Sequence, residues 1–297
     1  MTLVVGSTGS LGTEVCTLLL ARGHTVTAMV RPSSDPVKVA RLRSLGADII
    51  EGDLRDVISL RRACQGVDAV VVTATAVSSF TSENSFLSAD LGVRDLIDAA
   101  KSARVQQFIF TSYSGNLNPD CDLNVAKRAV EQHLLESGLT YTVLRPSCFM
   151  EMWLSPATGF DAVRGRAQLI GSGDQAISYI SLFDVARFAA LAVGHIEAQN
   201  AILELGGPEA ISPNEIVALC EDLSGRRFEL SYIPLDVLRT QVATADNALA
   251  KTFAALMLEI GNGDVIPMTQ MLRRFPQITL RSVRDFILQT IGVQASA

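Results

Sequence analysis

A glycine-rich turn between a strand and a helix is the feature that most constrains this chain. In "LVVGSTGSLGTEV", the glycines follow an apolar run at 2–5 and precede a segment of helical period at 11–22. One glycine permits the tight turn, another lets the backbone approach a pyrophosphate, and a third allows the helix to pack closely on the strand. Backbone N–H groups and the positive end of the helix dipole then hold the phosphates. The residues of this predicted nucleotide-binding loop are Gly6, Thr8, Gly9, Ser10, Leu11 and Gly12.

Strand and helix patterns alternate through the first half of the chain. Apolar, β-branched runs lie at 2–5, 24–30, 47–51, 68–75, 106–111 and 139–145. Segments of helical period lie between them, at 11–22, 36–45, 56–65, 85–103 and 123–137. The apolar runs are continuous rather than alternating, so both faces of the sheet are expected to be covered. The alternation predicts an α/β fold with a doubly wound parallel sheet of the Rossmann type.

Glycines also mark where the predicted helices end. Gly23, Gly46, Gly66 and Gly138 each follow a helical segment, at the position where a left-handed residue usually caps the helix. The regular alternation stops at Pro146, although later segments are expected to add one more helix and strand to the same sheet. The predicted domains are a dinucleotide-binding Rossmann domain at 1–150, completed by 176–205, and a smaller α/β substrate-binding lobe made of 151–175 and 206–297.

Composition narrows the class of protein. The chain has 297 residues, of which 48% are apolar and 19% charged, as in compact soluble proteins. A net charge of −6 argues against a nucleic-acid partner, which would call for a basic stripe. No apolar run approaches the ~20 residues of a membrane helix, and no basic region of a signal peptide precedes the first strand. The five cysteines lack a CxxC pair and the three histidines are scattered, which predicts reduced thiols in a cytoplasm and no metal site.

Two patterns resemble a known family. The glycine spacing is GxxGxxG rather than the GxGxxG of typical dehydrogenases, and it resembles the extended and atypical short-chain dehydrogenases/reductases. The stretch "AKRAVEQHLLESGLTYTVLRP", with Lys127 and Glu131 on its helix, resembles the NmrA-like atypical members, in which these features recur without a catalytic tyrosine. The resemblance covers essentially the whole chain and implies an NAD(P)-binding Rossmann fold. That family includes quinone and other small-molecule reductases, plant phenylpropanoid reductases, and redox sensors that bind NADP(H) without evident turnover.

The end of the second predicted strand indicates which cofactor is bound. An NAD site places Asp or Glu there to accept a hydrogen bond from the ribose 2′-OH. This chain has Arg31 instead, followed by Ser33 and Ser34. An arginine can pair with a 2′-phosphate and stack on adenine, whereas the alternative is a solvated surface arginine. Arg31 therefore predicts NADP(H) rather than NAD(H).

Two further strand ends carry candidate cofactor contacts. Asp53, in "IIEGDLRD", is expected at the carboxyl edge of the sheet, where ligands bind in such folds. The family resemblance implies that Asp53 and Leu54 contact the adenine, and the alternative is that Asp53 caps the following helix. Fold geometry places Ala74 and Thr75, after the fourth strand, beside the ribose and phosphates of the cofactor.

Ser112, Tyr113 and Lys127 are the candidate catalytic residues. In short-chain reductases a Ser or Thr polarises the carbonyl, a tyrosine four residues before the lysine donates the proton, and the lysine holds the ribose. The tyrosine position is Leu123 here, so the usual ketone-reductase mechanism is not expected. The resemblance to phenylpropanoid reductases implies an acid–base role for Lys127 itself. The alternative is that Lys127 and Glu131 merely form an i,i+4 helix pair.

Other groups are weaker candidates. Tyr113 can reach the site with Ser112 only if the strand has already ended, because adjacent strand residues point to opposite faces. Glu151 and Asp184 have no positional support as catalysts. In "SCFMEMW", Phe149, Met150 and Trp153 are predicted to line a permissive apolar substrate pocket, and the alternative is that they belong to the core.

The leading hypothesis is an NADPH-dependent oxidoreductase that reduces a small apolar quinone, enone or carbonyl by hydride transfer, for which a dedicated tyrosine is less necessary. The alternative is a non-catalytic NADP(H)-binding redox sensor that engages a protein partner. A sugar-nucleotide epimerase or dehydratase is disfavoured because those enzymes depend on the missing tyrosine. The partners expected are a small-molecule substrate and, if the protein self-associates, a second copy in a homodimer; neither nucleic acid nor a membrane is expected.

Overall fold

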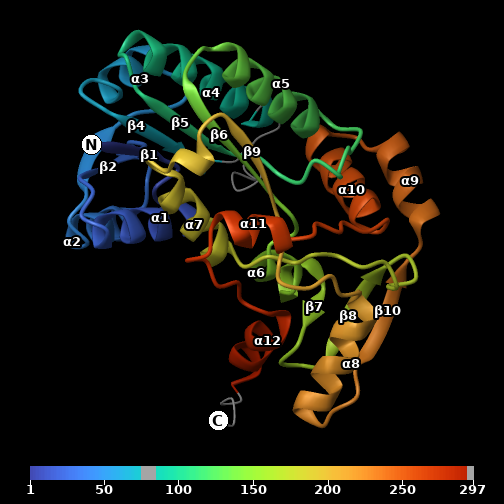
Figure 1. The fold of residues 1–297 in the computed structure, drawn as a ribbon. Coiled ribbons are helices and arrows are strands. Elements are labelled where there is room, and N and C mark those ends of the chain that lie inside the picture. Colours follow the sequence, from blue (N-terminus) through green and yellow to red (C-terminus); the bar gives the residue numbers. More distant parts are fainter. Residues whose placement is uncertain (75–84, 293–297) are drawn as a thin grey trace. The chain divides into compact units, whose positions relative to one another are not determined.

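Seven strands form one sheet in the order β3-β2-β1-β4-β5-β6-β9 (Figure 1). The computed structural model describes residues 1–74 and 85–292, and for 85–91 it describes the backbone only. The strands are β1 (Thr2–Val5), β2 (Val26–Val30), β3 (Asp48–Glu51), β4 (Ala69–Val72), β5 (Gln107–Thr111), β6 (Thr140–Pro146) and β9 (Ala201–Leu205). Pairing is parallel from β3 through β6. The predicted doubly wound sheet is confirmed.

Helices cover both faces of this sheet, with α1, α2 and α7 on one side and α3, α4 and α5 on the other (Figure 1). Their bounds are α1 (Ser10–Ala21), α2 (Pro36–Ser44), α3 (Val57–Ala63), α4 (Ser85–Ser102), α5 (Asp122–Glu136) and α7 (Leu182–Ala192). Every residue of β1, β2, β4 and β5 is buried, as continuous apolar strands require. The edge strand β3 is partly exposed.

Local sequence signals account for the helix ends. The carboxylates of Asp35 and Asp56 accept hydrogen bonds from the backbone of α2 and α3, and thereby cap their first turns. The four glycines predicted as C-caps all adopt positive φ angles, between 69° and 98°. α1 buries Gly12, Val15, Cys16 and Leu19, which share one face because they are three or four residues apart.

The chain divides into two compact units. Unit 1 contains 1–112, 122–145 and 185–203, and unit 2 contains 113–121, 146–184 and 204–297. The large sheet and its helices make up most of unit 1, whose core includes Phe108 and Phe110.

Unit 2 is built on a small sheet in the order β10-β8-β7. Its elements are α6 (Met150–Trp153), a 3₁₀ turn (Pro156–Thr158), β7 (Phe160–Asp161), β8 (Arg166–Ile170), α8 (Pro213–Ser224), β10 (Glu229–Ile233), α9 (Leu235–Thr244), α10 (Ala248–Ile260), α11 (Thr269–Arg274) and α12 (Val283–Ile291). α8 begins with a capping box of Ser212 and Glu215 and ends at the left-handed Gly225. α12 begins with a second box of Ser282 and Asp285.

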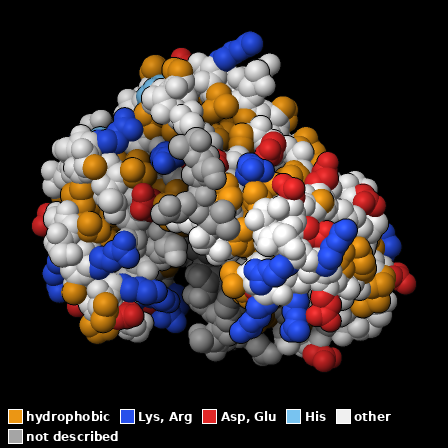
Figure 2. Space-filling model, turned by 90° about the horizontal axis from the view of Figure 1, so that it is seen from below, with side chains coloured by type: hydrophobic (Ala, Val, Ile, Leu, Met, Phe, Trp, Pro, Cys, Tyr) orange, Lys and Arg blue, Asp and Glu red, His pale blue; other side chains and the backbone are white. Residues whose placement is uncertain are grey.

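The described residues were expected to contain no membrane-spanning helix, no metal site and no disulfide. None of the described helices combines the length and the hydropathy that crossing a bilayer demands. Among the same residues, no three His, Cys, Asp or Glu side chains are grouped to hold a metal ion. All five cysteines are buried and carry free thiols. On the face shown in Figure 2, basic and acidic side chains are interspersed with apolar ones.

Candidate functional site

The glycine loop joins β1 to α1 at the point where the strand order reverses, between β1 and β4. Gly6 has a φ of 85°, and a Cβ there would lie 2.6 Å from the backbone nitrogen of Ala74. A Cβ at Gly12 would lie 2.2 Å from the carbonyl oxygen of Gly6. Gly9 is less crowded, since a Cβ there would meet only that same oxygen, at 3.3 Å. Packing therefore requires the first and third glycines, and the middle one leaves the loop open to a ligand.

Two residues that the sequence did not single out brace the loop. Ser7 is fully buried and its hydroxyl donates to the carbonyl of Met29 at 2.7 Å, which fastens the loop to β2. Thr73 donates from beyond β4 to the carbonyls of Val5 and Gly6, at 3.2 and 3.3 Å. The sequence signal that could have identified them is a hydroxyl residue within two positions of the end of each of two neighbouring strands.

The first turn of α1 can accept an anion. Its N-cap is Gly9, which offers no side-chain acceptor, and the turn contains no acidic residue. The first backbone N–H groups of a helix have no partner within the helix and carry its positive dipole end. A phosphate group fits this position, as the glycine pattern predicted.

Arg31 follows the last residue of β2 and is exposed. The Arg31 and Ser34 residues form a turn, in which the Arg31 N–H donates to the Ser34 hydroxyl at 3.0 Å and the Ser34 N–H donates to the Arg31 carbonyl at 2.9 Å. An arginine thus stands where an NAD site would place a carboxylate.

Asp53 lies just beyond β3, and its carboxylate is held by Arg55. The Nε of Arg55 donates to Oδ1 at 3.0 Å and Nη2 donates to Oδ2 at 2.7 Å. The hydrogen bond from Arg55 is the main reason that the Asp53 pKa is lowered, and the charge of Arg31 adds to the effect. The alternative interpretation of Asp53 as the cap of α3 is wrong, because Asp56 caps that helix.

The remaining candidate contacts with the cofactor lie near these strand ends. Leu54 and Ala74 are half-buried and pack against the core of unit 1. Thr75 lies outside the described residues.

Lys127 lies on the buried face of α5 and is only 2% exposed. Its Nζ lies 4.7 Å from the centre of the Phe110 ring and 3.4 Å from the carbonyl oxygen of Thr111. Leu123, one turn earlier on the same face, is 3% exposed. The residue in the tyrosine position is therefore a buried apolar side chain.

Glu131 is buried beside Lys127 but pairs with two arginines. Arg145 of β6 reaches its Oε2 at 2.5 Å, and Arg128 reaches its Oε1 at 2.7 Å. Burial raises the pKa of Glu131, but the hydrogen bond from Arg145, with Ser112 and the charge of Arg128, outweighs it and leaves the pKa lowered. The ion pair of Glu131 with Arg145 joins α5 to β6, and this pair is called the clasp of unit 1 below.

The two hydroxyl candidates belong to different units. Ser112 is the last residue of the first segment of unit 1 and is 8% exposed. Its hydroxyl contributes to lowering the Glu131 pKa, yet it makes no hydrogen bond of normal geometry with any described residue. β5 ends at Thr111, so Ser112 and Tyr113 are not held in the alternating geometry of a strand. Tyr113 is half-buried and packs against the core of unit 2.

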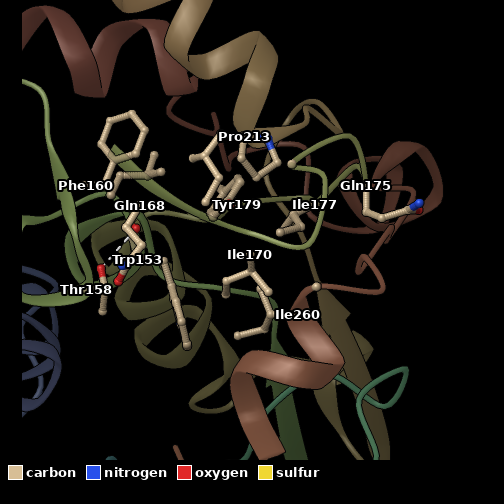
Figure 3. A pocket seen from close by; sticks show the side chains of 14 residues that line it. Trp153, Thr158, Phe160, Gln168, Ile170, Gln175, Ile177, Tyr179, Pro213 and Ile260 are labelled. Atoms are coloured by element: carbon tan, nitrogen blue, oxygen red, sulfur yellow. Dashed lines mark hydrogen bonds between the residues drawn. The ribbon is translucent and has the colours of Figure 1, made fainter. Parts of the chain in front are cut away.

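The three predicted substrate residues differ in exposure. Met150 is fully buried in the core of unit 2, whereas Phe149 and Trp153 are half-buried. Trp153 lines a cavity of about 40 Å³ inside this unit, together with Ile170, Ile177 and Ile260 (Figure 3). That volume is well below the ~150 Å³ that accommodates a benzene ring, so the cavity does not hold an aromatic substrate as it stands.

Glu151 and Asp184 have structural roles in unit 2. Glu151 accepts from the Ser181 hydroxyl at 2.6 Å and from the backbone of Leu182 at 2.8 Å, where α7 begins. Asp184 is fully buried and accepts from the backbone of Arg281 at 2.8 Å.

Solved structures with the same fold include NADPH-dependent reductases. The quinone oxidoreductase QOR2 from Escherichia coli, in complex with NADPH, aligns with a TM-score of 0.79 and 23% identity over 97% of this chain and 99% of that one. The leucoanthocyanidin reductase–NADPH complex from Vitis vinifera aligns with a TM-score of 0.81 and 18% identity, over 98% and 99%. Identities this low show a common fold.

The relatives found by sequence include an assembly factor and a reductase. The photosystem II assembly factor Ycf39 of Cyanophora paradoxa is 31% identical over 238 residues, which are 80% of this chain and 72% of that protein. An NAD(P)H azoreductase of Xenophilus azovorans is 28% identical over 290 residues, 96% and 95% of the two chains. The model of the NmrA-like family matches residues 1–270. With this match over most of its length, the chain belongs to the NmrA-like family, as its glycine spacing and its lysine helix predicted.

Proposed function

We propose that this chain is an NADPH-dependent oxidoreductase that reduces a small apolar quinone, enone or carbonyl compound by hydride transfer. The observation that carries the proposal is the glycine loop, in which packing forbids side chains at Gly6 and Gly12 and α1 begins without a side-chain cap. This loop fits a pyrophosphate. The NADPH complexes among the structural neighbours and the azoreductase among the relatives support the same cofactor class.

The residues of unit 1 suit NADPH in particular. Loop residues 6–12 would hold the pyrophosphate, Arg31 would pair with the 2′-phosphate, and Asp53 would accept from the adenine amino group. Lys127, beside the carboxyl end of β5, would hold the ribose hydroxyls of the nicotinamide half. When bound, the reduced nicotinamide supplies the hydride.

The substrate class that we propose follows from the lack of a proton-donating tyrosine at position 123. Leu123 offers no proton, so a reaction whose product anion is already stabilised suits this chain better than reduction of a simple ketone. Quinones and enones meet that condition, because the negative charge is delocalised. Lys127 and Ser112 would stabilise the developing charge. Tyr113, Phe149 and Trp153 of unit 2 are candidate substrate contacts, whereas Met150 is fully buried and would act only by packing behind them.

NADPH oxidation against a panel of quinones and enones tests the proposal. Lys127→Met should lower the rate by about 10²-fold, since general acid–base and electrostatic groups contribute on this scale. Lys101→Met is the matched control, because Lys101 is an exposed lysine in the last turn of α4. Wild-type turnover that survives in Lys127→Met would contradict the role of Lys127.

A second candidate function is a non-catalytic NADP(H)-responsive regulator with a protein partner. The photosystem II assembly factors among the relatives favour it, because their names describe assembly rather than catalysis. Tight NADPH binding without oxidation of NADPH by any substrate of the panel would support this function. In either case we propose a cytoplasmic location, which the five free, buried thiols support.

A further inference from the structure

Three charged residues follow the carboxyl ends of the neighbouring strands β2 and β3. Arg31 follows β2, and the pair of Asp53 and Arg55 follows β3, which is the neighbouring strand. Arg55 grips the Asp53 carboxylate through both Nε and Nη2, and its backbone N–H donates to Oδ1 at 2.9 Å. The carboxylate is 23% exposed and the arginine side chain 69%, so the pair borders solvent.

Val30 pairs with Glu51 in the sheet, and the Gly52 N–H donates to the Val30 carbonyl at 2.9 Å, so Arg31 and Asp53 each directly follow a residue of this contact. The charge of Arg31 accordingly contributes to the lowered pKa of Asp53. An anion that pairs with Arg31 would therefore also experience the negative charge of Asp53. Like charges at such a site repel, and a 2′-phosphate carries more than one negative charge. Unless it were compensated, Asp53 would weaken the binding of NADPH more than the binding of NADH.

We propose that Arg55 is a specificity-determining residue that acts through Asp53: it neutralises and orients this carboxylate, and so permits a 2′-phosphate to bind at Arg31. This inference rests on the proposed function, which supplies the NADPH. Arg55 thereby makes an acidic residue compatible with a site that selects a phosphorylated ribose.

The acceptor geometry of Asp53 agrees with this role. A carboxylate has about four lone-pair positions, and Arg55 occupies two on Oδ1 and one on Oδ2. One position on Oδ2 is left for the adenine amino group. Arg55 thus holds the carboxylate in one orientation without consuming its capacity to accept from the cofactor.

Dissociation constants for NADPH and NADH, measured by nicotinamide fluorescence, test the inference. Arg55→Ala should weaken NADPH binding by about five-fold and NADH binding by less than about two-fold, the scale of one unit charge acting across a solvated site. The double variant Asp53→Asn, Arg55→Ala should recover most of the loss for NADPH, because the repelling charge is gone. Arg61→Ala removes the same charge from an exposed position of α3 and should leave both constants unchanged.

Folding of these variants is not at risk, because an exposed ion pair contributes little to stability. The inference about Arg55 would be overturned, and the proposed function left standing, by either of two results. One is an equal loss of affinity for NADPH and NADH in Arg55→Ala, and the other is a double variant that recovers no affinity for NADPH. The Arg31→Ala variant tests the proposed NADPH site itself. If wild type does not prefer NADPH, or if Arg31→Ala weakens both cofactors alike, the proposed NADPH site and this inference both fail.

Discussion

Glu131 in unit 1 and Asp264 in unit 2 are both buried carboxylates, and their charges are compensated in different ways. Glu131 in unit 1 is 4% exposed and pairs with Arg145 and Arg128. Asp264 in unit 2 is 1% exposed, and no cation among the described residues pairs with it. Its three side-chain donors are Ser114 at 2.8 Å, Asn116 at 2.9 Å and Ser147 at 2.6 Å.

The two buried carboxylates join segments of their units through different kinds of interaction. In unit 1 the negative charge of Glu131 is balanced by the positive charges of arginines. The loss of Arg145 therefore leaves a buried charge partly uncompensated. In unit 2, neutral donors share the charge of Asp264, and these donors come from the segments after β5 and after β6. The loss of any one of these donors should therefore lower the free energy of unfolding by less than the loss of Arg145 does. Unit 1 should therefore be more sensitive to the loss of a single charge.

The largest expected effect is that of Arg145→Met. Removing one partner of a buried ion pair typically costs about 3–5 kcal/mol, and we expect the free energy of unfolding to fall by about 3 kcal/mol. Urea unfolding monitored by circular dichroism measures it. Arg43→Met is the control, because Arg43 is exposed in the last turn of α2 and its loss should cost less than about 1 kcal/mol. Equal losses in the two variants would contradict the clasp.

An intermediate effect is expected at Asp264. Asp264→Ala leaves the buried hydroxyl donors of Ser114 and Ser147 without their acceptor, and the free energy of unfolding should fall by about 2 kcal/mol. Asp264→Asn keeps the shape and one acceptor oxygen, so about 1 kcal/mol is expected. The same urea titration applies, with Asp246→Asn as the control at an exposed position. A loss for Asp264→Asn as large as that for Arg145→Met would break the contrast between the two units.

The smallest effect is a dependence of stability on pH in the acid range. The pKa of Glu131 is lowered from its ordinary value of 4.5, so the folded state binds its proton less readily than the unfolded state does. Its contribution to stability is therefore complete above the unfolded pKa and is lost as the pH falls through the folded pKa. Urea midpoints measured at pH 7 and below pH 4.5 should differ less in Glu131→Gln than in wild type. An unchanged pH dependence in that variant would argue against the lowered pKa.

Much of unit 1 could be predicted from the sequence. The strand β4, expected at 68–75, ends at Val72, and the extra residues include Thr73, which turns back to brace the glycine loop. The positions of the loop glycines, Arg31 and Lys127 followed from the alternation of strands and helices. The partners of these residues did not follow, because a pattern places a side chain on an element but does not say which neighbour it contacts.

The sequence by itself determined the alternation of strands and helices, the glycine loop, the helix ends and the absence of a tyrosine at position 123, because each depends on residues within a few positions of one another. Only the tertiary structure decided where the buried charges find compensation. Glu131 pairs with an arginine 14 residues away on β6, and Asp264 accepts from residues 117 to 150 positions away. A buried carboxylate must be compensated by whatever the fold brings beside it, and that neighbour is set by packing rather than by local pattern.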